Sequence, residues 1–278
     1  MNNTDDNDMK IYPVVDDEDV MKLDRDFKDP LQKPPFVKIL LGSRGTGKTA
    51  TLINEIFRKN MYGDIKNKEP IFNDIIVFSS TLGCDSTSRH LVKKATATHN
   101  TYDDILVKEI LDFQRETPKK DRKHICIIAD DIAPILKRDD EIFKLCSVHR
   151  HYLISIYFLI QSPRLIPPIV RNCYTSMYVY RLPNMEQQEK LFYDLSFLGN
   201  KKDIQKMYNY ATNKPFQFLY VDALQNKVFK WCATQPELMW EKYDEDGQYN
   251  PPFTKTLSDK EIVKQKKEEI ESDDDEEV

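Results

Sequence analysis

An eight-residue glycine-rich segment carries the residue types and spacing that most directly indicate chemistry. Its pattern is G-x-x-x-x-G-K-[ST], which lets backbone N–H groups turn inward toward phosphate oxygens. In such a loop the lysine reaches the β- and γ-phosphates and the final hydroxyl ligates Mg²⁺. We therefore predict a nucleotide site for ATP and Mg²⁺. The nucleotide-binding residues are Gly42, Ser43, Arg44, Gly45, Thr46, Gly47, Lys48 and Thr49, of which Thr49 is also a metal ligand.

Two adjacent aspartates, Asp130 and Asp131, follow an apolar run and resemble a Walker B motif. The Asp130 carboxylate would hold Mg²⁺ through water, and Asp131 could orient and deprotonate an attacking water. The alternative is that the pair only caps a turn. The glycine-rich segment upstream favours the first interpretation, because it supplies a phosphate for the pair to face. Two acidic side chains also favour hydrolysis over simple nucleotide storage.

A polar side chain, Gln161, directly follows the apolar run 154–160. At the end of a strand, its amide can contact the γ-phosphate or the attacking water. Arg150 lies eleven positions earlier, as 161 − 150 = 11, and Arg171 and Asn172 follow. This region therefore adds polar and cationic groups to the predicted phosphate site.

Alternating strand-like and helix-like segments can position these residues. Strands are predicted by β-branched and aromatic runs at 36–41, 74–80, 124–130, 154–160 and 175–182. Helical patterns occupy 48–59, 103–115, 139–149 and 185–198. Two later runs, 216–223 and 227–233, predict an antiparallel hairpin. The expected fold class is α/β: a P-loop NTPase of RecA-like type, with a mostly parallel sheet flanked by helices, the added C-terminal hairpin and disordered ends.

Composition divides the chain into three parts. Its 278 residues, 40% of them hydrophobic, are enough for one sizeable core. We expect an acidic, disordered arm over 1–30, an ATPase domain over 31–240 and a charged, mobile tail over 241–278.

The net charge of −5 neither supports nor excludes a DNA partner. Five scattered cysteines and the lack of an apolar run near ~20 residues predict a soluble protein with reduced thiols and no transmembrane segment.

The segment from Arg150 to Asn172, with its pattern RH…ISI…QS…PP-x-x-R-N, resembles the FtsK–HerA division of P-loop motor ATPases. Within that division it is similar to the genome-packaging ATPases of poxviruses, other large nucleocytoplasmic DNA viruses and virophages. The resemblance covers about residues 36–182. Its specific part is this segment, because the glycine-rich loop and the Asp-Asp pair are shared with many ATPases.

The resemblance implies a motor that hydrolyses ATP, translocates double-stranded DNA and packages a viral genome into a capsid. It implies a homo-oligomeric ring, usually a hexamer, with ATP at subunit boundaries and DNA in the pore. Arg150 would be the finger that reaches a neighbour's γ-phosphate, with Arg171 as the runner-up, so the catalytic set is Asp131, Gln161, Arg150 and Arg171. Capsid or virion membrane proteins are the further partners, and the host cytoplasm, the viral factory or the virion is the expected location.

DNA contact is expected to be independent of sequence, because we find no separate DNA-reading domain. Two basic clusters could contact phosphates: Arg89, Lys93 and Lys94, or Lys119, Lys120, Arg122 and Lys123. Two other functions remain open, namely a nucleotide-dependent switch or assembly scaffold and a DNA translocase or terminase-like ATPase of another P-loop branch. Asp131 and Gln161 favour the motor over the switch, since a switch needs less hydrolytic equipment.

Overall fold

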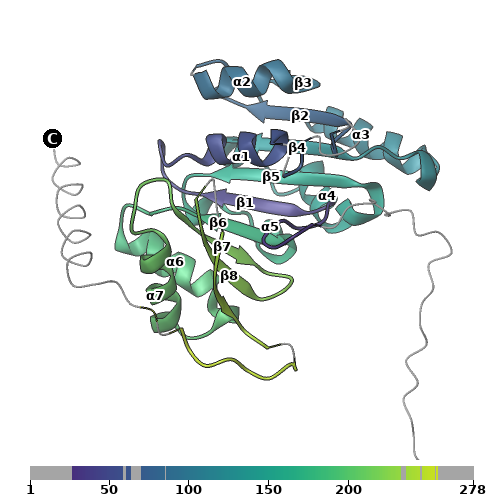
Figure 1. The fold of residues 1–278 in the computed structure, drawn as a ribbon. Helices are drawn as coiled ribbons and strands as arrows, with labels where there is room; N and C mark the ends of the chain where they lie inside the picture. The colour runs from purple at the N-terminus through teal and green to yellow at the C-terminus, as the bar shows by residue number, and fades with distance from the viewer. Residues whose placement is uncertain are drawn as a thin grey trace, which may run out of the picture.

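A nine-stranded sheet forms the centre of the protein, in the order β3-β2-β4-β5-β1-β6-β7-β8-β9 (Figure 1). The structure is a computed structural model that describes residues 27–58, 61–63, 70–84, 86–232, 236–244, 246–253 and 255. The parallel strands are β1 (Val37–Leu41), β2 (Asp74–Ser79), β3 (Ala97–His99), β4 (Ile125–Asp130), β5 (Ile154–Ile160) and β6 (Ser176–Val179). The antiparallel strands are β7 (Phe218–Asp222), β8 (Lys227–Trp231) and β9 (Glu237–Glu241).

Strand β1 lies between β5 and β6 and is buried along its whole length. Its residues alternate between the two faces of the sheet, so Ile39 joins one apolar cluster and Leu40 joins the other. Strands that are covered on both faces read as continuous apolar runs, which explains why the sequence predicts them well. The glycine-rich segment therefore begins at the end of a strand that is fully buried.

Helices cover both faces of the sheet. They are α1 (Lys48–Phe57), α2 (Ser86–Lys94), α3 (Asp104–Glu116), α4 (Glu141–Val148), α5 (Pro168–Cys173), α6 (Met185–Asp194) and α7 (Lys201–Ala211). Leu52 of α1 and Leu91 of α2 belong to one apolar cluster, whereas residues of α3 to α7 belong to the other. The predicted α/β class, with a mostly parallel sheet between two helical layers, is confirmed.

Several boundaries and elements differ from the sequence prediction. The helix predicted over 185–198 ends at Asp194, and a separate 3₁₀ turn follows over Ser196–Leu198. Strand β7 begins at Phe218 rather than at residue 216, because Phe216 has a left-handed φ of 62° and lies in a turn. Five elements of the structure have no counterpart among the predicted segments: α2, β3, α5, α7 and β9. Strand β9 extends the predicted hairpin to three antiparallel strands.

The predicted arm and tail fall mainly outside the described residues, at positions 1–26, 245, 254 and 256–278. Within the predicted tail, residues 246–253 return along β9: the Trp240 indole donates a hydrogen bond of 2.9 Å to the Pro251 carbonyl, and Phe253 is buried. No helix in the described part of the chain is both long and apolar enough to cross a membrane.

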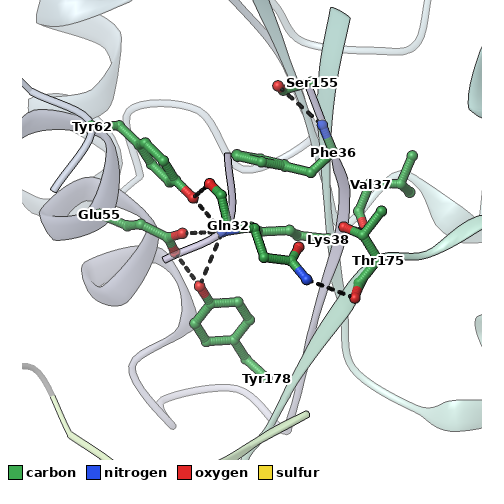
Figure 2. Close-up of polar contacts among 9 residues, drawn as sticks. All are labelled: Gln32, Phe36, Val37, Lys38, Glu55, Tyr62, Ser155, Thr175 and Tyr178. Carbon is green, nitrogen blue, oxygen red and sulfur yellow. Dashed lines mark hydrogen bonds and ion pairs between the residues drawn. The ribbon is translucent and has the colours of Figure 1, made fainter. Parts of the chain in front are cut away.

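A buried ion pair joins β1 to α1, on either side of the glycine-rich segment (Figure 2). Lys38 of β1 and Glu55 of α1 are 0% and 1% exposed, and their nitrogen and oxygen lie 2.5 Å apart. Lys38 also donates to the Tyr62 hydroxyl at 2.9 Å, while the Tyr178 hydroxyl of β6 donates to Glu55 at 2.6 Å. Burial lowers the pKa of Lys38, and the Glu55 carboxylate opposes that shift. This network fixes the helix against the strand that precedes the loop.

Candidate active site

The glycine-rich segment forms a tight loop between β1 and α1. The Gly42 amide donates to the Ile160 carbonyl at 3.0 Å, which continues the pairing of β1 with β5. A Cβ at Gly42 would lie 2.7 Å from Cβ of Tyr180, a distance that side chains do not tolerate. Gly47, the N-cap of α1, has φ of 97° in the left-handed region that glycine favours. The loop geometry thus requires glycine at both ends.

Lys48 lies beneath this loop at the start of α1. Its ammonium donates to the carbonyls of Gly42 at 2.5 Å and Ser43 at 2.9 Å, and only 8% of the residue is exposed. Burial lowers the pKa of Lys48, although the carboxylates of Asp131 and Asp130 act to raise it. The lysine is therefore a partly desolvated cation beside backbone N–H groups, which is a suitable environment for a phosphate.

The acidic pair lies at the end of β4. Asp130 is buried and accepts a hydrogen bond of 3.0 Å from the Ser79 hydroxyl of the neighbouring strand β2. Asp131 is half-buried and has φ of 52°, a left-handed conformation that aspartate adopts more readily than most residues. The sharp change of direction gives the two carboxylates different environments, although both line the same cavity: Asp130 is buried beside Ser79, and Asp131 is half-buried.

Gln161 lies beside Asp131, because β5 is the neighbour of β4 in the sheet. Its side-chain amide donates a hydrogen bond of 2.9 Å to Oδ2 of Asp131. Both residues line an open cavity of about 640 Å³. The other lining residues are Arg44, Gly45, Gly47, Lys48, Thr49, Ala50, Thr81, Cys84, Thr87, Asp130 and Phe216. The structure thus brings most of the predicted loop together with Asp130, Asp131 and Gln161.

The oxygen groups in this cavity fit Mg²⁺. Thr49 offers a hydroxyl and Asp130 a carboxylate, which are the hard ligands that Mg²⁺ prefers. Among the described residues, no group of three or more His, Cys, Asp or Glu side chains could hold a metal ion. A Mg²⁺ at Thr49 and Asp130 would complete its coordination with water and nucleotide phosphates. When bound, this ion would neutralise charge on the β- and γ-phosphates.

Arg150 lies far from the cavity of its own subunit. It is exposed on the 3₁₀ helix η3 (His149–Tyr152), which precedes β5, whereas Gln161 follows the same strand. The seven residues of β5 span roughly 23 Å at about 3.3 Å per residue. Within one chain, Arg150 lies at the amino-terminal end of the parallel strands, and the phosphate loop lies at their carboxyl-terminal end.

Arg171 makes contacts inside its own subunit. Its guanidinium donates to the Pro163 carbonyl at 2.9 Å and lies 3.7 Å from the Asp194 carboxylate. Pro163 is the second residue after Gln161, so Arg171 fastens the segment that follows Gln161 to α5 and α6. The structure does not bring either predicted arginine into the cavity of the same chain.

The two basic clusters lie in different surroundings. Arg122 donates to the His151 carbonyl at 2.6 Å, and Lys123 pairs with Asp74 at 3.3 Å. Lys119 and Lys120 are exposed on a short 3₁₀ turn before β4. The other cluster lies on α2, where the Lys94 ammonium is 4.7 Å from the centre of the Phe57 ring. The exposed lysines before β4 lie at the same, amino-terminal end of the parallel strands as Arg150.

Six residues of the cavity or its support are not among the predicted site residues: Ser79, Ala50, Thr81, Cys84, Thr87 and Phe216. The sequence could have indicated Ser79, because it lies near the carboxyl end of the predicted strand 74–80 and the carboxyl ends of parallel strands lie side by side. Phe216 had no such signal, since it reads as the first residue of the predicted hairpin. Its place in the cavity depends on the turn that precedes β7.

Known structures share this fold. The genome packaging NTPase B204 from Sulfolobus turreted icosahedral virus 2, in complex with AMP, is 13% identical over 71% of this chain and 96% of that one, with a TM-score of 0.52. Its sulfate complex is 17% identical over 71% and 96%, with a TM-score of 0.51. The DNA-packaging ATPase B204 from Sulfolobus turreted icosahedral virus is 12% identical over 71% and 97%, with a TM-score of 0.51. At these identities the similarity establishes the fold.

The sequence itself gives the family. No curated protein matches the chain significantly. A family model described as "Poxvirus A32 protein" matches residues 24–248, which is most of the chain. This match confirms the resemblance to poxvirus proteins that the segment from Arg150 to Asn172 indicated. The chain therefore belongs to the Poxvirus A32 protein family.

Proposed function

We propose that this chain is an ATP-hydrolysing motor that moves double-stranded DNA and packages a viral genome. Membership of the Poxvirus A32 protein family supports this function, as does a fold shared with a genome packaging NTPase. The observation that carries the proposal is the position of Asp131 and Gln161 opposite the phosphate loop in one cavity. A simple nucleotide store would not need this pair.

The residues of the cavity have distinct proposed roles. Loop N–H groups and Lys48 bind the phosphates, and Thr49 and Asp130 hold Mg²⁺. Asp131 accepts the proton of the attacking water, because its carboxylate is half-buried at the open side of the cavity. Gln161 orients Asp131 through their hydrogen bond and responds to the γ-phosphate. Hydrolysis then alters this side-chain contact between the residues that follow β4 and β5.

A ring accounts for the position of Arg150. The length of β5 separates Arg150 from the cavity of its own chain, so this arginine does not reach the phosphates bound there. Its side chain is exposed at the other end of the strand, where a neighbouring subunit can contact it. We propose a hexamer in which Arg150 contacts the neighbouring γ-phosphate, so that hydrolysis depends on subunit position. Arg171 is the second candidate for this finger. Contacts to DNA are to phosphates, and capsid or virion membrane proteins in the viral factory are the proposed partners.

The test of the proposal is the ATPase rate with and without double-stranded DNA, with particle size measured in the same buffer. The motor predicts turnover that rises on addition of duplex DNA and that accompanies a ring-sized particle. Slow turnover that DNA does not change would favour a nucleotide switch or assembly scaffold instead. Lys48→Ala is the control, since it removes the phosphate-binding cation and should abolish turnover in every condition.

A further inference from the structure

An exposed aromatic side chain, Phe216, lines the cavity beside the phosphate loop. It lies in the turn between α7 and β7 and is 66% exposed. A Cβ built on Gly47 would lie 3.1 Å from Cδ1 of Phe216, so the ring is placed against the loop at the start of α1. Among the described residues that line the cavity, Phe216 is the sole aromatic one.

The fold does not bury this ring, although an apolar core lies close by. Phe218, two residues later, is 1% exposed and packs against the Tyr180 ring at 5.0 Å. Phe216 instead takes a left-handed φ of 62°, which bulky side chains seldom adopt. Residues with strained backbone conformations cluster at binding sites. An exposed phenyl ring is also stabilised when a ligand covers it and removes its apolar surface from water.

The order of strands places Phe216 relative to the phosphate loop and the acidic pair. The phosphate loop follows β1. On one side of β1 lie β5 and β4, which are followed by Gln161 and the acidic pair. On the other side lie β6 and then β7, and Phe216 precedes β7. A nucleotide whose terminal phosphate faces Asp131 must extend its nucleoside toward the opposite side. Phe216 lies on that side, next to Gly47 at the end of the loop.

We propose that Phe216 is the platform on which the purine base of the bound nucleotide stacks. This inference rests on the proposed nucleotide-binding function and adds the part of the site that recognises the base. Every base has a π-face, so stacking on a phenyl ring contributes affinity without reading the base edge. The platform therefore serves adenine and guanine nucleotides alike, and it contributes nothing to the binding of a ligand that has no base.

Calorimetric titration of ADP and of inorganic tripolyphosphate separates these contributions. Phe216→Ala should weaken ADP binding about tenfold or more and leave tripolyphosphate affinity within about twofold of wild type. Phe216→Trp, which keeps an aromatic face, should retain ADP affinity. The matched control is Phe113→Ala, which removes another exposed phenyl ring, 56% exposed on α3, and should change neither affinity.

Each other outcome has a definite meaning. Unchanged ADP affinity in Phe216→Ala would overturn the platform, and so would an equal loss for both ligands, which would indicate that the ring only supports the loop. A smaller particle with normal ADP affinity would assign Phe216 to a subunit interface and also overturn it. Wild-type protein that binds neither ligand would contradict the proposed nucleotide site itself, whereas binding of both with no effect of Phe216→Ala would contradict the platform alone.

Discussion

The side-chain amide of Gln161 donates a hydrogen bond of 2.9 Å to Oδ2 of Asp131, and this contact joins the ends of two neighbouring parallel strands. The carboxylate is thereby oriented before any phosphate arrives. A γ-phosphate in the cavity would offer the amide a second acceptor, so the same contact can change with the state of the nucleotide. In the proposed mechanism, the base Asp131 and the phosphate sensor Gln161 therefore form one unit.

Asp131→Asn tests the role of the carboxylate as a base. An asparagine keeps the size of the side chain and can still accept a hydrogen bond from Gln161, but it cannot take a proton from water. We expect near-normal affinity for ATP with Mg²⁺ and turnover that falls at least ~100-fold. Equilibrium binding and steady-state hydrolysis measure the two effects. Asp139→Asn, on the exposed surface, is the control, and a loss of affinity as large as the loss of rate would argue against this role.

The lowered pKa of Lys48 predicts how nucleotide affinity depends on pH. In the free protein burial lowers this pKa, and a bound phosphate anion would raise it, so binding favours the protonated lysine. Affinity should therefore be highest below the free-state pKa and should fall as the pH rises through it. Titrations with ADP from neutral pH to above pH ~10 avoid the phosphate ionisation near pH ~6. Lys48→Met should bind weakly, with a flat profile; a pH slope equal to that of wild type would contradict this account.

Arg150→Ala subunits should bind nucleotide normally and lose turnover by a factor of about 10³. If the arginine acts on a neighbour, mixing these subunits with Lys48→Ala subunits should restore some activity, because a boundary can pair an intact loop with an intact arginine. Specific activity should also rise with protein concentration. Co-assembled mixtures that stay inactive, together with activity that does not depend on concentration, would show that Arg150 is not such a finger.

Arg171→Ala should act mainly on local structure. Its guanidinium holds the Pro163 carbonyl and the Asp194 carboxylate, so removal should loosen the segment that follows Gln161. We expect a loss of about 1–3 kcal/mol in the free energy of unfolding and a smaller fall in turnover than for Arg150→Ala. Chemical denaturation and hydrolysis rates compare the two variants. Unchanged stability with a turnover loss of about 10³ would instead assign the finger to Arg171.

The buried pair of Lys38 and Glu55 should couple strongly in stability. Lys38→Met leaves a buried carboxylate without its cation and should lower the free energy of unfolding by about 3–5 kcal/mol. Combining it with Glu55→Gln should cost less than the sum of the single changes, because the neutral amide can still accept from Tyr178. Lys144→Met, which removes a surface pair with Glu141, should change stability far less, because water screens an exposed ion pair. Additive effects at Lys38 and Glu55 would show that the pair does not couple.

The sequence predicts the parts of the site that lie close together in the chain or at strand ends. The phosphate loop is a contiguous motif, and Asp130 and Gln161 each end or follow an apolar run. Ser79 and Phe216 depend instead on which strands become neighbours, since β2 lies beside β4 and β7 beside β6 only in the folded sheet. Lys38 likewise reads as one polar residue in an apolar run, and its partner Glu55 lies on a different element.

Helix α7 and strand β9, neither of which was predicted, differ in how clearly the sequence indicates them. The buried positions of α7, namely Ile204, Met207, Tyr208 and Ala211, have helical spacing, so its pattern was present in the sequence. Strand β9 pairs with β8 alone in the described sheet, and its apolar run is only three residues long, between Glu237 and Glu241. Such an edge strand is stabilised by one partner, which a local pattern does not reveal.

ATP-dependent displacement of a third strand from a DNA triplex tests the central claim most directly, because it reports movement along duplex DNA as well as hydrolysis. Wild-type protein should release the third strand only when ATP and Mg²⁺ are both present, and release should be later when more duplex separates the loading end from the triplex. Asp131→Asn should bind the duplex without release. Wild-type protein that hydrolyses ATP and binds duplex DNA, yet never displaces the third strand, would contradict the motor.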